Sequence, residues 1–284
     1  MRLVRLAGGD QLPALGLGTW RMGEGKRTRA ADIAAVKVTL AIGYRLIDTA
    51  EMYGDGGAEE VVGAAIQETL QAGNVSRKEL AIVSKVLPGN ASHAGVLSAC
   101  ERSLKRLQLD VIDLYLLHWR GSVPLKETVA AFEQLRNEGR IRHWGVSNFD
   151  TADMQQLWSD PAGANCVANQ VYYSASERNI EFDLLPWQRD HGVVTMAYSP
   201  IDQGALARDT TFATIGRRHR VSASTAALAW VLRQPDVIAI PKAVSEPHLR
   251  ENYLAASVHL TTDDIAQIDA RFPPPNRKRR LAMV

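Results

Sequence analysis

Short apolar runs recur along this chain, and most of them end in a polar residue or a turn. They lie roughly 25 to 45 residues apart, far enough for each strand to be followed by a crossover helix. Mostly apolar strands that alternate with helices are typical of a parallel sheet covered on its faces. The eight runs are residues 15–18, 46–47, 81–84, 111–117, 144–146, 167–169, 193–197 and 237–240.

Segments with a helical period of apolar residues lie between most of these runs. Gly43 and Gly139 close two of them, as glycine often does at a helix end. Eight such units in about 250 residues predict an α/β protein with a (β/α)8 TIM barrel. The predicted helices are residues 30–42, 59–70, 94–107, 126–138, 151–158, 183–190, 223–233 and 247–255.

Residues 4–12, around Gly8-Gly9-Asp10, are predicted to form a β-hairpin that closes the barrel floor. We see no linker and no break in composition, so residues 1–284 are predicted to be a single barrel domain. The alternative is an open doubly wound sheet with a dinucleotide fingerprint. Gly16 and Gly18 follow a strand, but Arg21 stands where the third glycine belongs and no helix opens there. The sequence therefore favours the barrel.

Charge and cysteine content exclude several functions. The chain has 33 Lys and Arg against 31 Asp and Glu, a net charge of +2, which does not favour nucleic-acid binding. Its one basic cluster, residues 277–280, lies in a proline-rich tail and is predicted to be solvated. Two cysteines exclude a disulfide framework, and the histidines lack metal-ligand spacing, so we expect no metal. Without a signal peptide or a membrane-spanning run, the protein is predicted to be cytoplasmic.

Polar side chains stand where several of the apolar runs end. Asp48, Lys85 and His118 each follow a run directly. Tyr53 follows Asp48 by five residues, in a glycine-rich loop. Because the carboxyl ends of barrel strands carry the chemistry in this fold, we expect these four side chains to converge at one mouth.

This set has a specific chemistry. A phenol has a pKa near about 10, so a lysine cation beside Tyr53 is expected to stabilise the phenolate and lower that pKa. Asp48 would keep Lys85 charged, and His118 would donate a hydrogen bond to a substrate oxygen. The set suits proton delivery to an oxygen that gains negative charge, which is what hydride reduction of a carbonyl needs.

Taken alone, each residue has an ordinary structural explanation. Asp48 could cap the next turn and Tyr53 could pack on glycine. Lys85 could be a solvated strand end, and His118 a core histidine. The occurrence of all four at successive strand ends favours the catalytic interpretation.

With these residues the chain resembles the aldo-keto reductase superfamily over essentially its whole length. The run from Asp48 to Glu59 also resembles a bacterial branch that reduces methylglyoxal and other small aldehydes. The stretches that carry the resemblance are Gly18-Thr19-Trp20, residues 47–54, 83–86, 114–119, 139–142 and 145–149, Asn169-Gln170, residues 197–200 and Ile240-Pro241-Lys242.

The resemblance implies an NAD(P)H-dependent reductase with Tyr53 as general acid, supported by Lys85 and Asp48, and His118 placing the carbonyl. The nicotinamide would stack on Tyr198, as a flat ring does on an aromatic platform. The implied cofactor-binding residues are Thr19, Asp48, Ser147, Asn148, Gln170, Tyr198, Ser199, Pro200, Ile201, Lys242, Ala243, His248, Glu251 and Asn252. Ser147 and Asn148 could otherwise be turn and capping residues.

The substrate pocket is expected to be aromatic. Trp20 and Trp119 follow the first and fourth strands, and with Tyr53 and His118 they are the predicted substrate-binding residues. Trp187 lies in a predicted helix and is expected in the core. The loop 120–123 and the tail beyond Phe272 are short, which indicates an open site and loose substrate selection.

Cofactor choice is where the sequence departs from the family. NADP-preferring members hold the 2′-phosphate with a lysine, a following serine or threonine, and an arginine six residues after the lysine. Here Lys242 is kept, but Ala243 lacks a hydroxyl and His248 replaces the arginine. Arg250 could reach round or could be a solvated helix face. We therefore expect NADPH to be preferred by a narrow margin, with NADH also used.

Two other functions stay open at this point. Lys85 could form a Schiff base, as in a lyase, although Asp48 would raise its pKa and oppose this. The barrel could also be a regulatory subunit that senses a cofactor, but all four catalytic positions are intact. We expect a small carbonyl substrate, no nucleic-acid or membrane partner, and a monomer.

Overall fold

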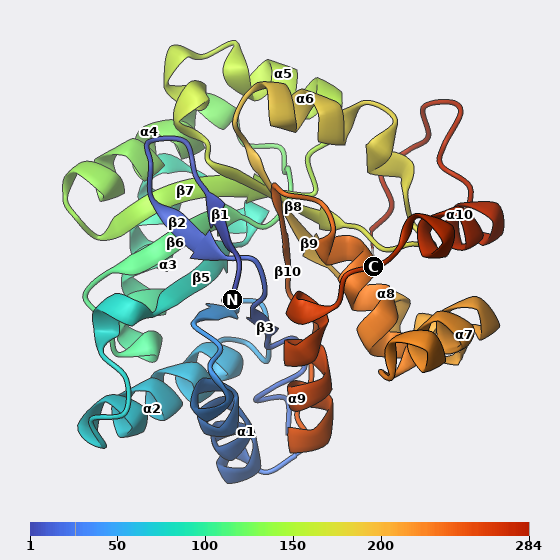
Figure 1. The fold of residues 1–284 in the computed structure, drawn as a ribbon. Coiled ribbons are helices and arrows are strands. Elements are labelled where there is room, and N and C mark those ends of the chain that lie inside the picture. Colours follow the sequence, from blue (N-terminus) through green and yellow to red (C-terminus); the bar gives the residue numbers. More distant parts are fainter. Residues whose placement is uncertain (26, 284) are drawn as a thin grey trace.

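The structure is a computed structural model that describes residues 1–25 and 27–283. Eight parallel strands lie side by side in chain order. The ring closes between its two ends, because Gly16 N donates to Ala239 O at 2.9 Å and Ala239 N donates to Ala14 O at 2.8 Å. The predicted barrel is confirmed (Figure 1). The strands are β3 (Leu17–Gly18), β4 (Leu46–Asp48), β5 (Ala81–Val86), β6 (Ile112–Leu117), β7 (Ile141–Ser147), β8 (Ala168–Tyr172), β9 (Val194–Tyr198) and β10 (Val237–Ala239).

Helices alternate with the strands and cover the outside of the barrel (Figure 1). Side-chain oxygens begin several of them: Thr28 accepts from Ala31 N, and Asp150 accepts from Asp153 N. The helices that match the predicted segments are α1 (Arg29–Ile42), α2 (Gly57–Gln71), α3 (His93–Leu107), α4 (Leu125–Asn137), α5 (Thr151–Trp158), α6 (Leu184–Asp190), α8 (Ala223–Leu232) and α9 (Glu246–Leu254).

Two helices were not predicted, α7 (Thr210–His219) and α10 (Thr262–Arg271). Each buries few side chains, and α10 buries only Asp264 and Ile268. Both lie outside the regular alternation of one helix after each strand, from which the other helices were predicted. Within the described residues, no helix is long and apolar enough to cross a membrane.

The N-terminal hairpin is present. Strands β1 (Leu3–Arg5) and β2 (Gln11–Pro13) pair antiparallel, and Gly8 and Gly9 make the turn with φ of +93° and +106°. Val4, Leu6 and Leu12 are buried in the core, and Asp10 contacts His143 near the start of β7 at 2.8 Å. The hairpin therefore covers the amino ends of the strands, which leaves the carboxyl ends at the opposite mouth.

Two of the expected strand ends lie inside their strands. Strand β5 continues past Lys85 to Val86, and β8 continues past Gln170 to Tyr172. Side chains alternate along a strand, so neighbours point to opposite faces. Ser84 donates outward to Glu59 of α2 at 2.5 Å, whereas Lys85 contacts Asp48 inside the barrel at 2.7 Å. The alternation delivers Lys85 to the interior.

Candidate active site

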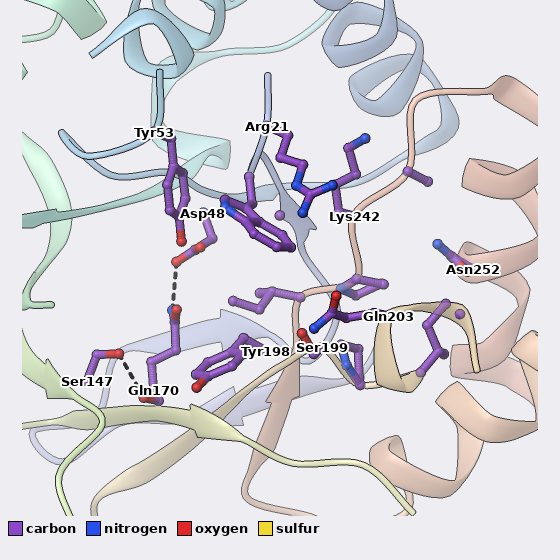
Figure 2. Close-up of a pocket in the computed structure, with 18 of the residues that line it drawn as sticks. Arg21, Asp48, Tyr53, Ser147, Gln170, Tyr198, Ser199, Gln203, Lys242 and Asn252 are labelled. Carbon is purple, nitrogen blue, oxygen red and sulfur yellow. Dashed lines mark hydrogen bonds between the residues drawn. The ribbon is translucent and has the colours of Figure 1, made fainter. Parts of the chain in front are cut away.

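A cavity of about 750 Å³ opens at the carboxyl ends of the strands (Figure 2). Most of the predicted site residues line it, so strands far apart in the sequence bring them together. The predicted residues on its wall are Trp20, Asp48, Tyr53, His118, Trp119, Ser147, Asn148, Gln170, Tyr198, Ser199, Pro200, Ile201, Lys242, Ala243, His248, Glu251 and Asn252.

Lys85 and Thr19 lie behind this wall. Thr19, an expected cofactor-binding residue, is fully buried and its hydroxyl donates to Asp48 O at 3.0 Å, so it supports the wall from behind. Lys85 is also fully buried, and its ammonium donates to Asp48 Oδ2 at 2.7 Å, to Thr49 O at 2.8 Å and to Tyr53 OH at 3.3 Å. All three ammonium protons therefore have acceptors.

The charges of this cluster are coupled. Burial disfavours the Lys85 ammonium, but Asp48 and Tyr53 outweigh it and raise the lysine pKa. Burial raises the pKa of Asp48, against the opposing effect of Lys85 and of Gln170, which donates to Asp48 Oδ1 at 2.7 Å. Lys85 therefore stays charged.

The expected lowering of the Tyr53 pKa is wrong for the protein without substrate. Burial raises the pKa of the phenol, and the Asp48 charge raises it too. Lys85 acts in the predicted direction but does not overcome burial. Tyr53 is therefore a protonated phenol at neutral pH, which is the form that a proton donor needs.

His118 lies edge-on to the Tyr53 ring, with 5.7 Å between ring centroids. Burial and the nearby Lys85 charge lower the pKa of His118 to about 2, so the imidazole is neutral. Its Nδ1 is buried with no hydrogen-bond partner among the described residues. A neutral imidazole carries one N–H, which suits donation to an oxygen without transfer of a charge.

One side of the cavity carries a hydrogen-bonded set of amides and hydroxyls (Figure 2). Ser147 Oγ donates to Gln170 O at 2.9 Å, and Tyr198 OH donates to Asn148 Oδ1 at 2.9 Å. Asn148 Nδ2 donates to His118 O at 3.1 Å. Since these bonds fix the Asn148 side chain and the Tyr198 ring, the set presents donors, acceptors and a flat surface together.

A lysine and a histidine lie at the far end of the cavity. Lys242 and His248 both line it, beside Ala243. Arg250 does not: its guanidinium donates to Glu246 Oε1 at 2.9 and 2.7 Å on the exposed face of α9. Of the two alternatives for Arg250, the structure supports the solvated helix face.

Glu251 and Asn252 also line this end. Asn252 is buried, and Glu251 Oε2 accepts from Ser222 Oγ at 3.1 Å. This bond ties α9 to the start of α8.

Several lining residues were not predicted. Arg21 has a left-handed backbone, with φ of +66°, and its guanidinium lies 4.3 Å from the centre of the Trp20 ring. Its position directly after a strand-end tryptophan was the only signal. Met283 comes from the C-terminal tail, which thus reaches the mouth despite its shortness. The other missed lining residues are Gly18, Met52, Gln203, Gly204, Ala207, Ser224, Ile240 and Pro241.

Two further expectations concern residues away from the cavity. Trp187 is partly buried and packs against the edge of the hydrophobic core, where it stacks on His191 with 3.9 Å between ring centroids. Residues 277–280 are exposed as expected, and Lys278 pairs with Asp183 at 2.9 Å.

Comparisons with known proteins agree with one another. The model of the aldo/keto reductase family matches residues 14–271. Methylglyoxal reductase YeaE of Escherichia coli (strain K12) is 44% identical, over 100% of this chain and 99% of that protein. Glyoxal reductase of Bacillus subtilis (strain 168) is 36% identical, over 94% of this chain and 91% of that protein. A crystal structure of an aldo-keto reductase from Klebsiella pneumoniae in complex with NADPH has a TM-score of 0.94 and 46% identity, covering 100% of this chain and 99% of that one.

Proposed function

The chain belongs to the aldo/keto reductase family, and from this premise we propose how its residues reduce a carbonyl. It is an NADPH-dependent oxidoreductase that reduces small aldehydes and ketones, methylglyoxal among them, to alcohols. The cavity supports this, because it joins a proton-donating cluster to a long, mixed binding surface.

The residues on the wall fit a nicotinamide dinucleotide. Ser147, Asn148 and Gln170 offer the donors and acceptors that a carboxamide needs, and the Tyr198 ring offers a platform. Lys242 and Arg21, which lie together away from this end in Figure 2, offer charge for phosphates. Bound there, NADPH supplies the hydride that reduces the carbonyl carbon.

Tyr53 donates the proton in our proposal. As negative charge grows on the carbonyl oxygen, the phenol gives up its proton and becomes a phenolate. The Lys85 ammonium, 3.3 Å from the phenol oxygen, stabilises that phenolate. Asp48 holds the ammonium in place and keeps it charged.

His118 places the substrate oxygen in our proposal. Its neutral ring donates a hydrogen bond and is held beside Tyr53, so the oxygen is fixed between the two groups. Trp20 and Trp119 line the same mouth and exclude water from it. A dry site strengthens both hydrogen bonds and the field of Lys85.

The single observation that carries the proposed mechanism is the contact of Tyr53 OH with a buried, charged Lys85 at the cavity mouth. The test is to follow NADPH oxidation by purified protein with a panel of carbonyl compounds. We expect turnover with methylglyoxal and other small aldehydes. Activity confined to a large steroid or sugar, with none on small aldehydes, would contradict the open-site argument.

Neither alternative function has support. A Schiff base needs a neutral lysine, whereas the pKa of Lys85 is raised. A regulatory barrel would show no turnover in the assay above. The cytoplasmic location, the single domain and the monomeric state stay predictions, and light scattering on a sizing column tests the last of these.

A further inference from the structure

Three residues in one loop at the cavity wall have a strained backbone conformation. Ser199, Asp202 and Gln203 have left-handed φ values of +48°, +51° and +49°. Residues with a Cβ rarely adopt this conformation, and they keep it only where the surrounding structure holds them. Ser199 and Gln203 line the cavity and lie beside Tyr198 in Figure 2.

Asp202 is the anchor of this loop. Its Oδ1 accepts from the hydroxyl of Tyr172, the last residue of β8, and its Oδ2 accepts from Ser176 Oγ at 2.8 Å. Burial raises the pKa of the Tyr172 phenol, and the bond to Asp202 raises it further, so the hydroxyl remains a donor. Both carboxylate oxygens are therefore held by the β8 side of the mouth.

Tyr172 also supports the nicotinamide platform. It is the register partner of Tyr198, and the two rings stack with centroids 5.6 Å apart and planes at 21°. One tyrosine thus touches both the platform and the anchor of the strained loop. Neither Tyr172 nor Asp202 is on the cavity wall.

We infer that Asp202 and Tyr172 are positioning residues that hold loop 199–204, beside the Tyr198 platform, in the shape that binds the dinucleotide away from its adenosine 2′-phosphate end. The inference rests on the proposed function, because it takes NADPH as the ligand. With the Asp202–Tyr172 hydrogen bond in place, the loop is ordered before the cofactor arrives, so binding does not have to offset the entropy lost in ordering it. Without it, the left-handed residues relax and the competent shape becomes a minor population.

The test measures equilibrium affinity for NADPH, NADH and adenosine 2′,5′-bisphosphate, a fragment that lacks the pyrophosphate and the nicotinamide. Asp202→Ala should weaken NADPH and NADH alike by about tenfold, the size expected for loss of a charge-assisted hydrogen bond. The fragment should bind as to wild type. Tyr172→Phe should act in the same direction, and Asp202→Asn, which keeps the acceptor for Tyr172, should restore most of the affinity.

Two matched variants control for general destabilisation. Asp209→Ala removes a carboxylate that caps α7, and Tyr173→Phe removes a hydroxyl that donates to Glu181 at 2.6 Å. These side-chain hydrogen bonds go to the start of α7 and to Glu181 rather than to loop 199–204, so the two variants should lose stability without losing cofactor affinity.

Two results would overturn the inference. If Asp202→Ala and Tyr172→Phe both bind NADPH within about twofold of wild type, the inference is wrong. If the fragment weakens as much as NADPH, the two residues serve only the fold, and the inference is also overturned. Should Asp202→Ala not fold, Tyr172→Phe, which removes a single oxygen, decides alone. Wild-type protein that bound no NADPH would instead overturn the proposed function.

Discussion

Burying the charged side chain of Lys85 costs the folded protein free energy. A fully buried ammonium loses its hydration, and replacing a buried ion pair with apolar groups is often neutral or stabilising. Asp48 and Thr49 O account for two of its three protons, and the third points to Tyr53. Stability therefore explains the pair poorly, whereas stabilising a phenolate during proton transfer explains it well.

Tyr53→Phe should abolish most reduction and leave NADPH binding nearly intact. General acid catalysis contributes about 10²- to 10⁴-fold in rate, and no other group is assigned to proton delivery. Lys85→Met should also be severe, because the phenolate would form without its cation. Steady-state kcat and cofactor affinity of both variants check this. A Tyr53→Phe enzyme that kept more than about a tenth of wild-type kcat would sink the assignment.

Neither Tyr53 nor His118 should titrate in the pH profile of reduction near neutral pH. A general acid works in its protonated form, so the rate falls as pH rises through its pKa. Burial raises the pKa of Tyr53 above its ordinary value of about 10, so kcat for reduction should stay level from about pH 6 to 9. His118, with its pKa near 2, should not titrate in that range. A fall near pH 7 that His118→Gln removed would contradict a neutral imidazole.

Residues that end a strand or follow it directly could be predicted from the sequence, because position in the repeat places them at the mouth. Asp48, His118 and Ser147 are of this kind. Met283 could not be predicted, since only the path of the tail brings it to the cavity. The sign of the Tyr53 pKa also needed the structure, because burial competes there with the lysine charge.

At the scale of elements, the strand–helix repeat specified the barrel, and helices with a broad apolar face were placed to within two residues. Helices α7 and α10 were missed because each is additional to the one helix expected after each strand, and polar contacts join the two. Asp264, near the start of α10, contacts Arg218 and His219 at the end of α7. It also accepts from Thr261 N at 2.9 Å.

Asp264→Ala should lower the free energy of unfolding by about 1 to 2 kcal/mol at neutral pH, since it removes a buried carboxylate that accepts from Thr261, Arg218 and His219. Burial opposes ionisation of Asp264, but bonds from His219 and Thr261 outweigh it and lower the carboxyl pKa. A lowered folded pKa stabilises the protein above the unfolded value of about 4, and that stabilisation is lost as pH falls further. Urea unfolding at about pH 7, 5 and 3 measures the difference in the free energy of unfolding between wild type and Asp264→Ala. This wild-type advantage should shrink only at the lowest pH. An advantage that stayed constant would mean that the carboxylate charge contributes nothing.

At the scale of the whole molecule, the cavity joins two groups of residues that lie far apart in the sequence. Proton delivery comes from β4, β5 and β6 on one side of the barrel, whereas the charged end comes from the segment after β10 and from α9. A ligand that reaches both ends must span the mouth. Cofactor identity and catalysis can therefore be altered separately.

Because the two ends are separate, cofactor preference can be measured without a change in the proton-delivering residues. Arg250 is engaged by Glu246 and off the cavity wall, so it does not replace the family arginine, whose position His248 takes beside Lys242. Loss of such a charge-assisted pair costs about 1.5 to 3 kcal/mol, or one to two decades of preference. We expect NADPH to be favoured narrowly, with NADH measurably used, in kcat/KM compared at one pH.

His248→Arg should widen the preference and leave kcat with NADPH unchanged, because it touches neither Tyr53 nor Lys85. A wild-type preference above about 10⁴ would mean that another cation holds the 2′-phosphate. Arg21 and Arg27, whose charges act on the pKa of Lys242, would then be the next residues to replace.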